Sequence, residues 1–132
     1  FIAGVFSIVI AVSLLWIFGA ELPTILSMTT KSITAPIAII TSEQIGAIPS
    51  LAVGFVLITG IIGALFGTIV FKLINIKYDT SKGFALGLVS HGIGTARAIE
   101  ISEKAAAFSA LAMGLSGIFT AVFLPMIITF FK

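Results

Sequence analysis

The stretch "LAVGFVLITGIIGALFGTIVF", residues 51–71, carries no charged residue and is apolar along its whole length. A helix of about 20 residues crosses the roughly 30 Å hydrocarbon core of a bilayer. Two further runs have the same character, "FIAGVFSIVIAVSLLWIFGA" (residues 1–20) and "AAAFSALAMGLSGIFTAVFLPMIITFF" (residues 105–131). Lipid offers the backbone no hydrogen-bond partner, and the runs lack the alternation of a barrel strand. Each is therefore predicted to be a membrane-spanning helix.

The composition of the 132 residues agrees with this prediction, since 59% are hydrophobic and only 9% are charged. Soluble domains carry about 25% charged residues, and so short a chain cannot bury this much apolar surface. We predict an all-α polytopic membrane protein whose first partner is the lipid bilayer. A soluble enzyme is excluded, and the chain offers no convincing nucleophile for a membrane enzyme, so we predict that it is not an enzyme.

The charged residues also exclude some classes of partner. The net charge of +2 is scattered between apolar runs, as expected for topology signals rather than for a nucleic-acid surface. Cysteine is absent, and one histidine with scattered carboxylates does not make a metal site, so we expect no metal and no cofactor. Because Phe1 already lies inside an apolar run, we predict that residues 1–132 are one transmembrane domain, the C-terminal part of a longer chain.

Two further apolar segments, residues 21–50 and 83–104, are interrupted near their middle. The interruptions are "TKSITAP" (residues 30–36) and "SHGIGTA" (residues 90–96). Pro36 cannot continue a preceding helix, and Gly92 with Gly94 allows a tight backbone turn. Both segments are predicted to be broken helices, either re-entrant hairpins or discontinuous crossings.

The two broken segments resemble each other. A shift of 60 residues aligns residues 33–58 with 93–118 without a gap, and ten of the 26 positions match, including the pair Ser42-Glu43 with Ser102-Glu103. We predict a span (1–20) and two repeat units (21–71 and 83–131), joined by a polar loop (72–82).

The orientation of these units depends on how the broken segments cross the bilayer. Re-entrant hairpins make the units inverted, a common arrangement in transporters, whereas full crossings make them parallel. The short arms favour the inverted form. The loop holds three lysines against Asp79, which predicts that it is cytoplasmic.

The interruptions are the candidate site. Thr34 is predicted to cap a helix that begins at Ala35 with Pro36 in its first turn, and Thr95 to cap a helix over residues 96–108. Two helix N-termini facing each other would suit a bound anion, because their N–H groups and dipoles are positive. Arg97 would add a bidentate donor for a carboxylate.

The predicted substrate-binding residues are Lys31, Thr34, Ala35, Pro36, Ser90, His91, Gly92, Gly94, Thr95 and Arg97. His91 and Glu100 are the candidates for coupling or orienting roles, because histidine titrates near neutral pH and Glu100 follows Arg97 by three residues. Plainer roles stay open. Arg97 would then reach toward headgroups, Glu100 would pair with Lys104, and His91 would be an interior histidine with its hydrogen bonds satisfied.

Other motifs are weaker evidence for a functional site. Gly92-x-Gly94 lacks the strand and third glycine of a dinucleotide site, and Ser90 beside His91 has no orienting acid. The pairs Gly63/Gly67 and Gly83/Gly87 are packing faces for use inside a bundle or between subunits, so a homo-oligomer is possible.

The runs "KSITAPIAIITSEQIGAIPSLAVGF" and "KGFALGLVSHGIGTARAIEISEKAAAFSALAMG" resemble the LrgB/CidB family of antiholin-like membrane proteins. The resemblance extends from about residue 31 to residue 125. It implies a multi-pass protein of the bacterial cytoplasmic membrane that works with a smaller LrgA/CidA-type partner and modulates murein hydrolase activity and cell lysis. A related protein of the plastid inner envelope, the alternative location, translocates glycolate and glycerate, and bacterial members are linked to pyruvate movement. The family supplies no settled catalytic residues.

Two functions follow as expectations. The first is a secondary transporter of small monocarboxylates (the pyruvate, glycolate and lactate class), which binds the anion at broken-helix termini. The second is an antiholin-like regulator of murein hydrolases and lysis. The paired broken helices favour the transporter, because an interaction module needs no charged groups at membrane depth.

Overall fold

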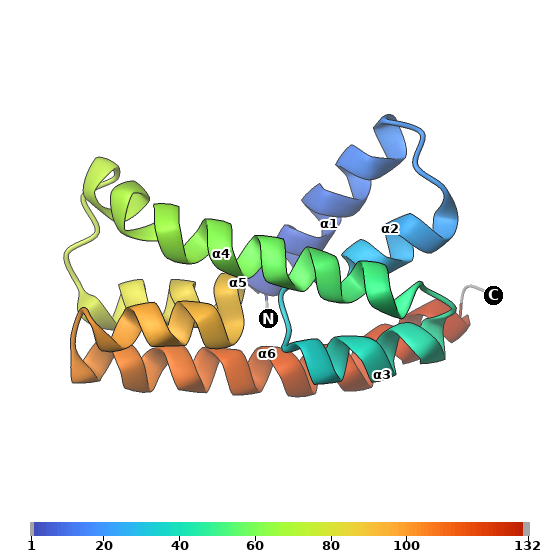
Figure 1. Cartoon of the computed structure of the whole chain (residues 1–132). Coiled ribbons are helices and arrows are strands. Elements are labelled where there is room, and N and C mark those ends of the chain that lie inside the picture. The colour runs from blue at the N-terminus through green and yellow to red at the C-terminus, as the bar shows by residue number, and fades with distance from the viewer. Residues whose placement is uncertain (1, 131–132) are drawn as a thin grey trace.

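The computed structural model describes residues 2–130, which form six helices and no strand (Figure 1). The helices are α1 (Ile2–Ile17), α2 (Leu22–Met28), α3 (Ala35–Ile45), α4 (Pro49–Leu73), α5 (Asp79–Ile99) and α6 (Glu103–Phe130). The prediction of an all-α fold is confirmed.

Two of the helices, α4 and α6, are long and apolar enough to cross a membrane. They have 25 and 28 residues and a mean hydropathy of 2.4 and 2.1 over their most apolar windows. They contain the predicted spans at 51–71 and 105–131, of which residue 131 lies outside the described range. Helix α1 is apolar but has 16 residues, and the crossing expected for residues 1–20 stays a prediction.

The first interrupted segment forms a helical hairpin. Helix α2 ends at Met28, the chain turns through residues 29–34, and α3 begins at Ala35 with a proline in its first turn, as the sequence predicted. Gly46, in the left-handed region at φ 77°, ends α3 and allows the chain to turn into α4.

The second interrupted segment, α5, also folds back on itself. Its backbone leaves the helical region at His91, with φ 42° and ψ −125°. Leu86 and Ala98, which a straight helix would separate by about 18 Å, share one core cluster. Helix α5 therefore has two arms, residues 79–90 and residues 92–99, which form the second hairpin.

The helix predicted for residues 96–108, with Thr95 as its cap, is wrong. Thr95 lies inside the second arm, which ends at Ile99, and α6 starts separately at Glu103. The chain turns between them because the N–H of Ile101 bonds the Ala98 carbonyl at 3.0 Å, and the Ser102 hydroxyl accepts from the first turn of α6 at 3.1 Å. A serine cap thus starts a new helix at a point where no glycine or proline marks the end of the preceding one.

Figure 1 shows how the hairpins relate to the long helices. The hairpin α2–α3 lies at the end where α4 begins, α5 lies at the opposite end, and both tips point toward the middle of α4. Their depth in a bilayer and their descent from an inverted repeat stay predictions. The shift of 60 residues places the turn at 46–48 six residues away from the turn at 100–102, and it pairs Ser42 inside α3 with Ser102, which caps α6.

Glycines make the close contacts between these helices. A Cβ on Gly83 or Gly87 would lie 2.0 Å from the carbonyl oxygen of Ala105 or Ser109 on α6. On α4, a Cβ on Gly63 would lie 1.8 Å from the Ser90 hydroxyl. In lipid, helices associate through such close packing rather than through the hydrophobic effect. The predicted packing faces therefore lie inside the bundle.

Candidate functional site

The two hairpin tips meet on one residue of α4, Val56. Its side chain packs with Ile33 and Ala38 of the first hairpin in a buried cluster. Its carbonyl oxygen lies 3.0 Å from Nε2 of His91 in the second hairpin. A carbonyl can only accept, so Nε2 carries a proton and donates it. Residues of both interrupted segments therefore contact the same turn of α4.

His91 occupies a backbone conformation that normally belongs to glycine. Its φ of 42° and ψ of −125° are sterically unfavourable for a residue with a Cβ, at a typical cost of about 1–3 kcal/mol. The imidazole is 4% exposed and lies over Gly60, where a Cβ would come within 2.7 Å of the ring. A glycine would relieve the backbone strain at position 91, but it would not place an imidazole against α4.

Four of the predicted site residues form one cluster around this tip: Ser90, His91, Gly94 and Thr95. The Thr95 hydroxyl donates to the His91 carbonyl at 2.8 Å and lies 2.9 Å from the hydroxyl of Ser109 on α6. The Ser90 hydroxyl is fully buried and has no hydrogen-bond partner. Gly92, by contrast, faces outward with open space where a Cβ would lie.

The first interruption holds a different cation environment. Lys31 is half-buried, and its Nζ donates to the hydroxyl of Ser7 on α1 at 2.7 Å and to that of Ser32 at 3.2 Å. Thr34 is the N-cap residue of α3, but its side chain makes no capping hydrogen bond, and Ala35 and Pro36 form the first turn. Lys31 thus contacts α1 rather than the second hairpin.

Arg97 and Glu100 lie apart from both interruptions. They form an ion pair with each other, and their side chains are 38% and 62% exposed. They line a shallow surface pocket with Ala64 and Leu65 of α4. The structure therefore does not bring Arg97 or Glu100 to the residues of the hairpin tips.

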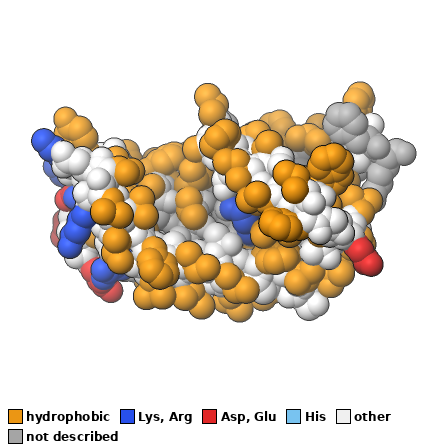
Figure 2. All heavy atoms as spheres, turned by 90° about the horizontal axis from the view of Figure 1, so that it is seen from above, with side chains coloured by type: hydrophobic (Ala, Val, Ile, Leu, Met, Phe, Trp, Pro, Cys, Tyr) orange, Lys and Arg blue, Asp and Glu red, His pale blue; other side chains and the backbone are white. Residues whose placement is uncertain are grey.

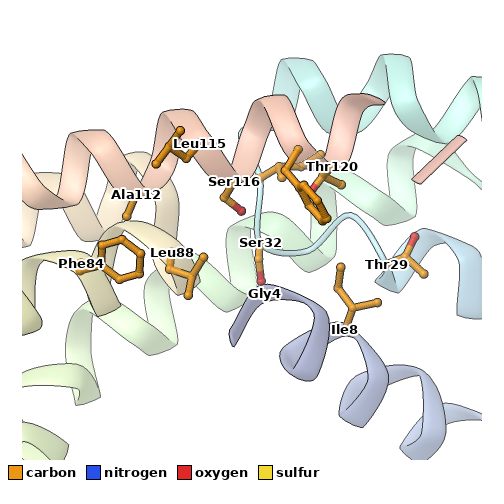
Figure 3. Close-up of a pocket in the computed structure, with 12 residues that line it drawn as sticks. Gly4, Ile8, Thr29, Ser32, Phe84, Leu88, Ala112, Leu115, Ser116 and Thr120 are labelled. Carbon is orange, nitrogen blue, oxygen red and sulfur yellow. The ribbon is translucent and has the colours of Figure 1, made fainter. Parts of the chain in front are cut away.

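A cavity of about 70 Å³ lies between α1, the first interruption, α5 and α6 (Figure 3). Its polar lining consists of hydroxyl groups, from Thr29, Ser32, Ser116 and Thr120. Figure 3 shows Ser116 on α6 and Ser32 on the first interruption, with the Ser32 side chain directed toward Gly4 of α1 and with Phe84 and Leu88 on the α5 side. Most of the lining is apolar, but the volume and the four hydroxyl groups are sufficient for water or a small polar ligand. In the part of the chain that the structure describes, no group of three His, Asp or Glu side chains is placed to hold a metal.

None of the four cavity hydroxyl groups is among the site residues that the sequence predicts. Ser116 and Thr120, like Ser7 beside Lys31, lie in apolar runs that are interpreted only as spans. Ser116 and Thr120 are four residues apart, so they share one face of α6 and both reach the cavity. That spacing of polar residues inside an apolar helix was the available signal.

The sequence model of the LrgB-like family matches residues 1–130. The chain belongs to this family. It is 32% identical over 127 residues to the holin-like protein CidB of Staphylococcus epidermidis, which covers 96% of this chain and 56% of that protein. It is 36% identical over 114 residues to the uncharacterized protein YxaC of Bacillus subtilis (86% and 50%), and 34% over 104 residues to YwbG of the same organism (79% and 46%).

This LrgB-like chain thus spans about half the length of the curated relatives it matches. No solved structure matches it. Family membership together with the two long apolar helices indicates a membrane protein. The LrgB/CidB family is not a known enzyme family, and the expectation that this chain is not an enzyme stays a prediction.

Proposed function

We propose that this LrgB-like protein is a secondary transporter of small monocarboxylates, of the pyruvate, glycolate and lactate class. The anion would bind at the first interruption, where Lys31 supplies a positive charge and the hydroxyl groups of the cavity supply hydrogen bonds. The first turn of α3, with its free N–H groups, would add to the positive potential.

The observation that carries the proposal is the environment of Lys31. Its ammonium group lies between two serine hydroxyls, of which Ser32 lines the cavity. Lys31 is the one cation of the described residues that lies away from the end where α4 stops and α5 and α6 begin. A half-buried lysine between apolar helices of a membrane protein is costly, and its retention there favours a functional role. Hydroxyl groups and an ammonium group are suitable donors for a carboxylate.

The hairpins provide the second part of the mechanism. Two interrupted helices that enter from opposite ends are the arrangement in which inverted-repeat transporters bind substrate near the midplane. In this proposal the tips separate the two aqueous sides, and the bond from His91 to Val56 holds the second tip against α4. Identical alanines buried in both units, Ala38 with Ala98 and Ala52 with Ala112, support the repeat.

The test is uptake of labelled pyruvate and glycolate by proteoliposomes, compared with empty vesicles. Lys31→Gln should reduce uptake at least about tenfold, the effect of losing one charged hydrogen bond, and Lys31→Arg should restore part of it. Lys77→Gln, in the exposed loop, is the matched control and should transport normally. Uptake by Lys31→Gln equal to that of the unchanged protein would remove Lys31 from the site, and absence of uptake would remove the transporter proposal.

A second candidate function is regulation of lysis with an LrgA/CidA-type partner. It is favoured by the name of the relatives, holin-like protein CidB, and by the apolar face that α1 leaves exposed at Phe6, Val9 and Trp16. Co-purification of the two proteins, with Phe6→Ser as the interface variant, tests it. A partner retained equally by the variant would exclude this face of α1.

In both proposals the protein is a multi-pass protein of the bacterial cytoplasmic membrane, and a homo-oligomer is compatible with either.

A further inference from the structure

Apart from Lys31, the charged side chains of the described residues lie at the two ends of the bundle. Five cations lie at the end where α4 stops and α5 and α6 begin: Lys72, Lys77, Lys82, Arg97 and Lys104. Figure 2 shows Lys and Arg side chains concentrated at this end, with acidic side chains among them. Three carboxylates accompany them: Asp79, Glu100 and Glu103. Among the described residues, the opposite end carries only the carboxylates Glu21 and Glu43.

A pocket of about 390 Å³ opens within the basic end. It lies between the last turns of α4, the start of α5 and the turn that precedes α6. Its polar lining comes from Thr68, Lys72, Asn75 and Lys82. Phe71 and Ile101 form its apolar floor and pack against the buried cluster of α5 and α6. The pocket is thus lined by two lysines and by two apolar residues that the core cluster holds in position.

The two lysines differ in how far their charge is already balanced. Lys82 Nζ lies 2.9 Å from a carboxylate oxygen of Asp79. That hydrogen bond, with a second one from Ser102, holds the pKa of Asp79 below its usual value, so the carboxylate remains charged. Lys72 forms no ion pair with any described residue. The pocket therefore presents one unshared positive charge and one partly shared.

The position of the pocket selects the source of its anion. It is at the end of a helix that is apolar enough to cross a membrane, and the neighbouring α4 residues Ile69 and Leu73 are 50% and 79% exposed. This is the level at which lipid phosphates meet the acyl chains. A free phosphate would leave the apolar floor and the flanking apolar face without a role.

We propose that this pocket binds the headgroup of an anionic phospholipid. The phosphate would lie between Lys72 and Lys82, Thr68 and Asn75 would hydrogen-bond the polar headgroup, and the acyl chains would follow the exposed face of α4. Basic pockets between helices on the cytoplasmic side of a membrane are suited to such lipids. The site is separate from the hairpin tips, and it does not depend on the proposed transport.

The experiment measures which lipids remain bound when the protein is purified from vesicles that contain equal amounts of phosphatidylglycerol and phosphatidylcholine. Native mass spectrometry counts the retained lipid. Phosphatidylglycerol should predominate, and Lys72→Gln should reduce its retention about fivefold, the effect of one lysine near anionic lipid. Lys72→Arg should restore it. Lys77→Gln removes a lysine of the same loop that does not line the pocket, and retention should be unchanged.

Three results would overturn the proposal. The first is equal retention of the two lipids, and the second is an equal loss in Lys72→Gln and Lys77→Gln, which would indicate diffuse surface charge. In the third, millimolar inorganic phosphate displaces the bound lipid completely, which would identify a site for a free anion. A circular dichroism spectrum of each variant separates loss of the site from loss of the fold.

Discussion

The two hairpins solve the same problem with different chemistry. The first turns through six residues, 29–34, and hydroxyl groups satisfy its backbone: Thr29 and Thr30 donate to carbonyls of the α2 end at 2.6 and 2.8 Å. The second reverses at His91 alone, and glycines bring its arms against each other and against α6. Backbone groups in a bilayer must find partners within the protein. Side-chain hydroxyls therefore stabilise the first tip, whereas the second combines close backbone packing with the hydrogen bonds of Thr95 and His91.

The largest effect is expected where close packing is removed from the second hairpin. Gly87→Ala places a methyl group 2.0 Å from the Ser109 carbonyl oxygen, so α5 and α6 must separate. We expect a loss of about 3 kcal/mol in the free energy of unfolding, measured in mixed detergent micelles. The control is Gly114→Ala on α6, which meets nothing within 4 Å and should be neutral or slightly stabilising. Equal losses in the two variants would contradict the role of close packing.

A smaller loss is expected from the hydroxyl groups of the first hairpin. The Ser27 hydroxyl donates to the Pro23 carbonyl at 2.7 Å and accepts from the N–H of Ile48 at 3.0 Å, so it fastens α2 to the start of α4. Ser27→Ala should cost about 1–2 kcal/mol in the same unfolding measurement. Ser50→Ala, at an exposed position, should change nothing measurable. If Ser27→Ala is as stable as the unchanged protein, packing alone holds the first hairpin.

A sign reversal tests the strained turn of the second hairpin. His91→Gly and His91→Ala both remove the hydrogen bond to Val56, but only glycine relaxes the positive φ. We expect the glycine variant to be the more stable by about 1 kcal/mol. At Thr95, inside a regular arm, the order should be the opposite, because alanine favours a helix by about 1 kcal/mol over glycine. If the alanine variant is the more stable one at both positions, the backbone at His91 is not strained.

The smallest effect is expected at two buried hydroxyls without partners, one in each hairpin. Ser42 and Ser90 are fully buried, and their hydroxyl groups make no hydrogen bond. Replacing either with alanine removes a polar group that nothing satisfies, so stability should stay within about 0.5 kcal/mol or rise. A loss above that range in thermal unfolding would reveal a partner of that serine hydroxyl, such as an ordered water.

The sequence predicted the two long apolar helices well because the signal for them is local. The apolar runs identified α4 and α6, and Pro36 with its neighbours identified the start of α3. The crossing expected for residues 1–20 stays a prediction. The glycines near residue 91 predicted a break but not its position. Gly94 is required for the contact with Leu86, where a Cβ would lie 2.2 Å from the carbonyl oxygen, so the reversal falls on His91 instead.

The candidate site was harder to predict, because a side chain's direction depends on tertiary packing. Arg97 was expected beside the first turn of a long helix, but the reversal at His91 and the turn at 100–102 direct it to the outer face. Lys31 is one of the predicted substrate-binding residues, but its Nζ donates to the hydroxyl of Ser7, a residue of α1 that no sequence pattern places nearby. The periodicity of a sequence shows which residues share one face of a helix. Which other helix that face contacts depends on how the whole bundle packs.

The meeting of both tips on Val56 has a mechanical consequence. Its side chain packs against the first hairpin and its carbonyl accepts a hydrogen bond from the second, so both hairpins contact the same turn of α4. A rotation of α4 that loosens the contact with Ile33 also changes the angle at which His91 can donate its proton. The positions of the two hairpins are therefore coupled, because a change in either contact with Val56 alters the turn of α4 that carries the other.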